Sequence, residues 1–205
     1  GGEGALIVVS GLLPLMYHAA GAIHEDRPNV ERKGDILPRA AFDAKVAQIF
    51  THCGESRLHA SLLCIVLEDF DQLASRPGQA TTDLIRQRFE DRLIAILRDD
   101  DVIGEMGDAR FNICTAPMRQ LDLETCIQLA GRLQSAVEEP ISVDGIALYV
   151  TASIGFCQHA RAPGKTASDW IDAANTALRE AQRHGPTAIR AFNENMHRAT
   201  QVRAT

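Results

Sequence analysis

The segment 59–67 constrains the fold of this chain more than any other segment. It is a mostly apolar run, HASLLCIVL, with the length and the β-branched content of a buried strand. Segments with a helical period surround it, because their apolar residues recur three or four positions apart. The predicted helices begin at Ala40 and cover 82–98, 123–137 and 167–184, and Thr82 is the expected N-cap of the second.

Short strand-like segments alternate with these helices and form two predicted hairpins. One hairpin pairs 101–104 with 110–114 around a tight turn. The other pairs 141–143 with 146–154 around Asp144-Gly145, a dipeptide that strongly favours a two-residue hairpin turn. Residues 188–192 are expected to form a closing strand. This order predicts an α/β or α+β sandwich in which helices cover a mostly antiparallel sheet.

The composition is that of a globular domain. The chain has 205 residues, of which 45% are hydrophobic and 23% charged, and its net charge is −6. An acidic balance without a run of Lys and Arg argues against nucleic acid as a partner. The longest apolar stretch, 5–16, is shorter than a membrane span and contains Pro14. The five cysteines include no C-x-x-C pair, so we expect reduced core residues and a cytoplasmic location.

Three strings in this order resemble the GGDEF domains, whose active members are diguanylate cyclases. The most specific, 139–155 (EPISVDGIALYVTASIG), resembles the E-P-x-x-V-D-G hairpin of the family and its T-A-S-I-G strand. Residues 36–42 (ILPRAAF) resemble its L-P-N-R entry to the first helix, and 174–185 (ANTALREAQRHG) its A-D-x-A-L-Y-x-A-K-x-x-G helix. The resemblance covers 34–195 and implies the nucleotidyl-cyclase palm-like sandwich of that family.

The resemblance also implies a metal site, whose ligand positions can be read in this sequence. Active members hold two divalent ions with the first Asp of a D-x-D-x-F strand end and with the acidic third residue of the GGDEF turn. Hard oxygen ligands are needed because Mg²⁺ must bridge phosphate oxygens during phosphoryl transfer. The matching positions are Val66 and Ala109, and Arg110 stands where the family has Glu. Both ligands are missing, so we expect no catalytic residue and no metal cofactor.

Two nearby carboxylates, Glu68 and Asp108, are the candidates for substitute ligands. In an ideal strand Glu68 shares a face with Val66 but lies about 7 Å further along it. Asp108 belongs to a hairpin tip, where Asp is a common turn residue. We interpret both as solvated or capping carboxylates. The alternative is an active cyclase in which these two side chains bind Mg²⁺.

The guanine and phosphate contacts of the family are eroded as well. Its Asn after the strand end matches Ala74, its Asp at the start of the next helix matches Asp83, and a phosphate-contacting Lys matches Gln182. Asp83 alone keeps the residue type of the family and is the candidate guanine contact. An Asp near a helix N-terminus also stabilises the helix dipole without any ligand.

One motif of the family is intact. Active members are commonly inhibited by their product through an R-x-x-D motif before the hairpin turn, and Arg98-Asp-Asp-Asp101 stands at that spacing before Gly107. Arg98 can pair with a phosphate or a guanine edge, and Asp101 can accept from guanine nitrogens. The alternative is a charged helix end, in which Arg98 favours the helix dipole and Asp101 favours a turn.

We therefore expect a catalytically inactive GGDEF-like regulatory module in cyclic di-GMP signalling, with cyclic di-GMP or GTP as candidate ligands. The partners implied by the resemblance are sensory and EAL domains in a longer bacterial chain, and a second copy in a homodimer. We interpret 1–33 as an N-terminal extension or the end of a preceding domain, and 196–205 as the start of a linker. The alternatives are an active diguanylate cyclase and a ligand-free dimerisation spacer.

Overall fold

The computed structural model describes residues 35–74 and 79–196, all within one unit, Arg32–Thr205. The interpretation of 1–33, and that of 196–205 apart from Met196, concern residues outside the described ones. The elements are β1 (Leu37–Pro38), α1 (Arg39–Ser56), β2 (Ser61–Glu68), α2 (Phe70–Ala74), α3 (Gln79–Ile96), β3 (Val102–Gly107), β4 (Arg110–Cys114), α4 (Leu123–Glu138), β5 (Ile141–Val143), β6 (Ile146–Leu148), β7 (Thr151–Gln158), a 3₁₀ turn (His159–Arg161), α5 (Ala167–Arg183) and β8 (Ile189–Ala191).

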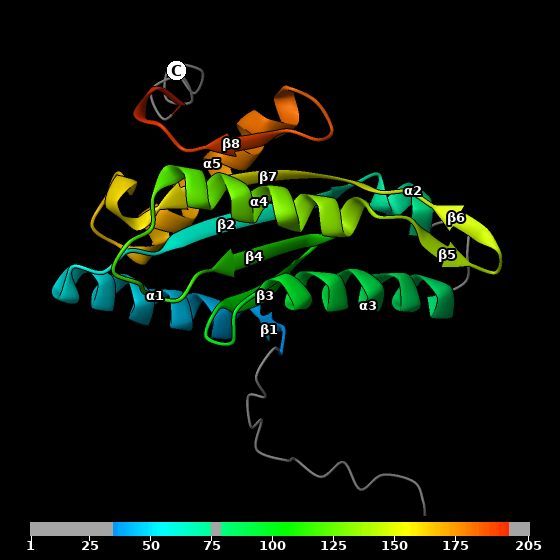
Figure 1. The fold of residues 1–205 in the computed structure, drawn as a ribbon, viewed down its shortest axis with the longest axis horizontal. Helices are drawn as coiled ribbons and strands as arrows, with labels where there is room; N and C mark the ends of the chain where they lie inside the picture. Colours follow the sequence, from blue (N-terminus) through cyan, green and yellow to red (C-terminus); the bar gives the residue numbers. More distant parts are fainter. Residues whose placement is uncertain (1–34, 75–78, 197–205) are drawn as a thin grey trace, which may run out of the picture. The chain divides into compact units, whose positions relative to one another are not determined.

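The main sheet has the order β1-β3-β4-β2-β7-β8, with β2 near its centre (Figure 1). The pairs β3–β4, β4–β2 and β2–β7 are antiparallel, and the two outermost pairs, β1–β3 and β7–β8, are parallel. Seven consecutive residues of β2, beginning with Ser61, are buried. The predicted buried strand and the mostly antiparallel α+β sheet are both confirmed.

Helices cover both faces of this sheet. One core contains Phe89 of α3 and Leu133 of α4, and it receives Leu63 and Ile65 from β2. The other core contains buried residues of α1 and α5, and it receives Leu62, Cys64 and Val66 from the same strand. Since successive strand residues point to opposite faces, β2 supplies both cores at once. Val66 lies on the face under α1 and α5, whereas Ala109 packs against the core under α3 and α4.

The prediction of one strand over 146–154 is wrong, because the structure has two strands there, β6 and β7. Residues Ile146–Leu148 pair only with β5 in a separate two-stranded sheet, and from Thr151 onward the chain pairs with β2. The chain changes partner at Tyr149, which is 70% exposed, and Val150, which is buried in the core beneath α4. The residues before Tyr149 therefore pair within the small hairpin, and the residues after Val150 pair with β2 in the main sheet.

Two local predictions near the second helix also need correction. Thr82 is not an N-cap, because α3 begins three residues earlier at Gln79 and Thr82 is buried within the helix. The short helix α2 between β2 and α3 was not predicted. By contrast, Asp122 is the N-cap of α4. Its side chain accepts a hydrogen bond from the Thr125 amide at 2.8 Å. This N-cap satisfies one of the amides that a helix start leaves without a partner.

All five cysteines are buried and free of disulfides, as expected. Burial raises the pKa of Cys64 and of Cys157 to about 12, so both thiols stay protonated and unreactive at neutral pH. None of the helices described is long and apolar enough to cross a membrane.

Candidate functional site

The turn between β3 and β4 carries the first candidate positions. Gly107 has φ 80°, Asp108 φ 49° and Ala109 φ 53°, and Gly107 pairs with Arg110 across the hairpin. A two-residue turn with positive φ at both central positions matches the right-handed twist of the strands that it joins. Asp108 adopts this conformation more readily than Ala109, because alanine has no side-chain oxygen to bond the backbone locally.

The hairpin tip folds back onto the end of β2. The Leu67 amide donates to the Ala109 carbonyl at 3.0 Å, and Arg110 stands directly opposite Val66 in the antiparallel ladder. The structure therefore brings together Val66, Ala109 and Arg110, although more than forty residues separate the first from the others. Val66 is 6% exposed, and Arg110 is exposed.

These residues do not fit a divalent metal ion. An isopropyl group, a methyl group and a guanidinium offer no oxygen ligand, and the guanidinium repels a cation. Within residues 35–74 and 79–196, no cluster of three or more His, Cys, Asp or Glu side chains is placed to hold a metal. The donor set thus disagrees with the two-metal chemistry that the resemblance implies for active members.

The two candidate substitute carboxylates are not adjacent ligands. Glu68, the last residue of β2, accepts a hydrogen bond from Gln182 of α5, with 3.2 Å between Oε1 and Nε2. Asp108 lies exposed at the hairpin tip in a left-handed conformation that the turn requires. The structure therefore gives each carboxylate a local role, Glu68 in binding α5 and Asp108 in the turn.

The guanine candidate lies on α3. Asp83 is exposed and stands four residues after the start of the helix, further inside it than predicted. Ala74 is the last residue of α2, and its side chain lies outside the described part of the chain. No described contact joins either residue to Val66 or Arg110. Their role as guanine contacts stays a prediction.

Arg98 and Asp101 lie between α3 and β3, at the other end of β3 from the Gly107 turn. The Asp101 carboxylate accepts from two backbone amides, Arg98 and Ala116, each at 2.8 Å. It thereby joins the end of α3 to the loop that follows β4. The Arg98 guanidinium is exposed. Asp101 thus has a structural role whether or not a ligand binds, whereas Arg98 is free to reach solvent.

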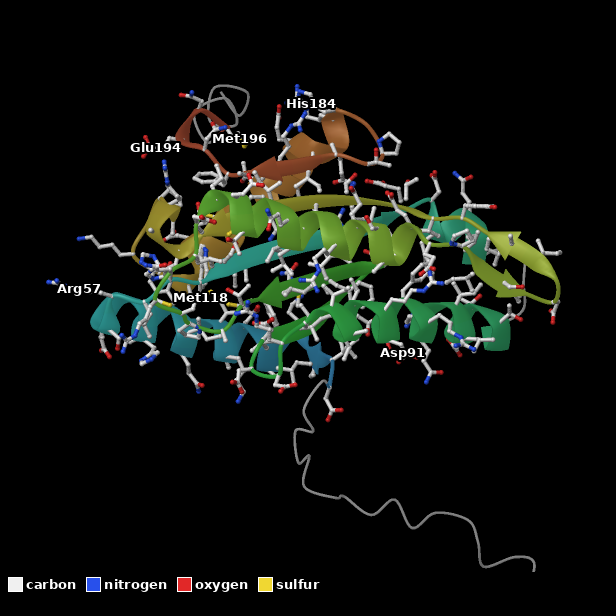
Figure 2. The ribbon with its side chains drawn as sticks, in the orientation of Figure 1. Arg57, Asp91, Met118, His184, Glu194 and Met196 are labelled. Carbon is white, nitrogen blue, oxygen red and sulfur yellow. The ribbon has the colours of Figure 1, made fainter. Side chains whose placement is uncertain are left out.

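Other features were not predicted from the sequence. A cavity of about 340 Å³ lies between α3 and β5, and its lining includes Arg88, Asp91 and Arg92 but none of the candidate residues above. Figure 2 shows Asp91 on the side of α3 that faces away from the sheet. Arg92 donates to the carbonyls of Glu139 and Pro140, so its charge stabilises the C-terminal end of α4.

Comparisons with known proteins agree with this fold. The model of the family described as "Diguanylate cyclase, GGDEF domain" matches residues 32–187. The GGDEF domain of TpbB from Pseudomonas aeruginosa superposes with a TM-score of 0.75 at 21% identity, covering 83% of this chain and 98% of that one. The active GGEEF domain of a diguanylate cyclase from Vibrio cholerae gives a TM-score of 0.70 at 16% identity, covering 78% of this chain and 99% of that one.

Two curated relatives from Pseudomonas aeruginosa are similar over most of this chain and are themselves longer. The cyclic di-GMP phosphodiesterase NbdA of Pseudomonas aeruginosa is 25% identical over 94% of this chain and 24% of its own length. The diguanylate cyclase TpbB of the same species is 24% identical over 70% of this chain and 34% of its own length. This chain thus spans about a quarter to a third of these relatives. Given the matched family model, the sheet order and the position of the β3–β4 hairpin, the chain belongs to the GGDEF domain family of cyclic di-GMP signalling.

Proposed function

We propose that this GGDEF domain is a regulatory module without diguanylate cyclase activity. One observation supports the proposal: the hairpin and the end of β2 bring the backbones of Val66, Ala109 and Arg110 together, and the resemblance implies metal ligands at the first two of these positions in active members. Without a metal, the attack of a 3′-hydroxyl on a nucleotide triphosphate loses most of its charge stabilisation. A positive side chain does not replace the geometry that two bridging ions impose.

Turnover of GTP tests this proposal. The purified chain is incubated with GTP and either Mg²⁺ or Mn²⁺, and cyclic di-GMP is quantified by chromatography. We expect product at the level of a buffer blank. Product above that blank, lost in Glu68→Gln or Asp108→Asn, would contradict the proposal and establish the substitute ligands of an active cyclase.

We further propose that the module binds cyclic di-GMP through Arg98. This exposed guanidinium stands at the inhibitory-motif position, and a charge-assisted pair with phosphate contributes about 1.5 to 3 kcal/mol. Arg98→Ala should therefore weaken affinity roughly ten-fold to a hundred-fold in a calorimetric titration. Arg88→Ala removes another exposed arginine from α3 and should leave the affinity unchanged.

Two results would contradict binding at Arg98. The first is no heat on titrating cyclic di-GMP into the unaltered chain. The second is equal affinity for the unaltered chain and Arg98→Ala. In the first case a ligand-free dimerisation spacer becomes the better interpretation, and its test is the dimerisation of the chain in sedimentation experiments.

We also propose that the module belongs to a longer chain with an EAL domain. The similarity to a phosphodiesterase of which it spans only 24% supports this context. The complete coding sequence tests it: an EAL domain with its acidic metal ligands supports a regulatory role beside a working phosphodiesterase. A gene that encodes no further domain contradicts it.

A further inference from the structure

The cavity of about 340 Å³ between α3 and β5 has a lining of mixed charge and shares no residue with the candidate site. Its volume lies at the small end of the range for sites that enclose small molecules. Four positions of α3 line it, and they are spaced three or four residues apart, so they share one face of the helix. These are Arg88, Asp91, Arg92 and Ala95, and β5 adds Ile141 and Ser142.

Contacts with the segment that leads into β5 hold Arg92 in place. Its Nη1 donates to the Glu139 carbonyl, and its Nη2 donates to the Pro140 carbonyl at 3.0 Å. A guanidinium has five N–H groups, so donors remain after both bonds are made. The charge of Arg92 is therefore positioned before a ligand arrives, and binding does not have to order this long side chain.

The other polar side chains of the lining, Arg88, Asp91 and Ser142, have no such internal contacts. Over residues 35–74 and 79–196, none of the side-chain hydrogen bonds and ion pairs found involves any of the three. Their positions three residues apart on the helix would allow Arg88 and Asp91 to pair, yet that pair is not formed. All three side chains are exposed, so a ligand in the cavity can reach them.

The charges of the lining are complementary to one chemical class. Each of the two guanidiniums can bind a carboxylate through paired hydrogen bonds, and the Asp91 carboxylate can bind an ammonium group. Ala95 and Ile141 offer apolar contact to a short aliphatic chain. A simple inorganic anion would pair with the guanidiniums but would stand beside Asp91, which has the same sign of charge. A ligand with two carboxylates, one ammonium and a short aliphatic chain matches every group.

We propose that the cavity between α3 and β5 binds a free acidic amino acid, with Arg88 and Arg92 on its carboxylates and Asp91 on its ammonium. Such a ligand bridges α3 and the β5–β6 hairpin, which forms a sheet separate from the main one. The inference adds a small-molecule ligand to the domain. It stands on the cavity and does not depend on the proposed loss of cyclase activity.

Nuclear magnetic resonance titration with L-glutamate and with L-aspartate tests the inference, with the amide shifts of the isotope-labelled chain as the readout. We expect saturable shifts centred on 88–95 and 141–142. Arg88→Gln removes a charge-assisted pair and should weaken binding roughly ten-fold or more. Arg132→Gln makes the same change at an exposed position of α4 that does not line the cavity, and should leave the affinity unchanged.

Glutarate tests the role of Asp91, because it has the two carboxylates of glutamate but lacks the ammonium. The unaltered chain should bind L-glutamate more tightly than glutarate. Asp91→Asn removes the negative charge from the lining and should abolish this preference, because the ammonium then has no carboxylate to pair with.

Three results would overturn the inference: no saturable shift with either amino acid, equal binding of glutamate and glutarate to the unaltered chain, or equal affinity of Arg88→Gln and Arg132→Gln. Circular dichroism establishes that each variant is folded, which we expect because the substituted residues are exposed. Cyclic di-GMP synthesis would contradict the proposed inactivity alone, whereas failure of amino-acid binding would contradict the inference about the cavity alone.

Discussion

Replacing Gly155 with alanine should destabilise the domain by about 4 kcal/mol or more, enough to unfold a domain of ordinary stability. A Cβ at this position would stand 1.9 Å from the Leu178 nitrogen and 2.4 Å from the Ala177 carbonyl carbon. Both atoms are backbone of α5, so no side-chain rotation relieves the overlap. The helix would have to move away from β7, which opens the core around Trp170.

Urea unfolding followed by circular dichroism measures this effect, and the chain offers a matched control. Gly131 lies within α4 with no atom within 4 Å of the position of an added Cβ. Gly131→Ala should therefore stabilise the domain by about 0.5 to 1 kcal/mol, because alanine is the better helix former. If Gly155→Ala unfolds at the same urea concentration as the unaltered chain, the close packing of α5 on β7 is wrong.

Asp101→Ala should lower the free energy of unfolding by about 3 kcal/mol. The substitution removes a charged acceptor from two backbone amides, those of Arg98 and Ala116, in a half-buried position. Asp101→Asn keeps one acceptor oxygen and should cost about half as much. Asp100→Ala alters the exposed neighbour and should change stability by no more than about 0.5 kcal/mol.

This result bears on how the R-x-x-D motif is tested. Loss of cyclic di-GMP binding in Asp101→Ala could come from a lost ligand contact or from the weakened junction between α3 and the loop after β4, and the measurement would not separate the two. Arg98→Ala leaves that junction intact, since the bond to Asp101 comes from the Arg98 backbone. If Asp101→Ala and Asp100→Ala unfold alike, the carboxylate does not join these segments in solution.

The sequence predicted the order of elements because each strand and helix carries its own periodicity and turn signals. It did not predict where the chain changes sheets at Tyr149, because that depends on which strand becomes the partner. The turn formed by Asp101 and Arg98 is local, and the sequence predicts it as the charged helix end that does not depend on a ligand. The bond from Asp101 to Ala116 spans fifteen residues and depends on the tertiary fold.

The candidate site likewise has residues that local sequence identifies and contacts that depend on the tertiary fold. Val66, Ala109 and Arg110 could be identified from the sequence because each stands at a fixed position in a string that resembles the family. The hydrogen bond from Gln182 to Glu68 could not, because it depends on how closely α5 packs against Gly155 of β7.

Direct measurement of Mn²⁺ binding tests most sharply the central claim that this end of the sheet has lost its metal site. In electron paramagnetic resonance the signal of free Mn²⁺ decreases when the ion binds protein, so the measurement does not depend on GTP recognition or turnover. Val66→Asp combined with Ala109→Asp provides the comparison, because it places a carboxylate at each of the two positions where the resemblance implies a metal ligand.

We expect the free Mn²⁺ signal with the unaltered chain to equal that of buffer, and the double variant to lower it. In the presence of GTP, the unaltered chain should lower the signal no further than GTP alone does. A stoichiometric loss of signal with the unaltered chain, reversed by Glu68→Gln or Asp108→Asn, would contradict the account and show that these carboxylates hold the metal.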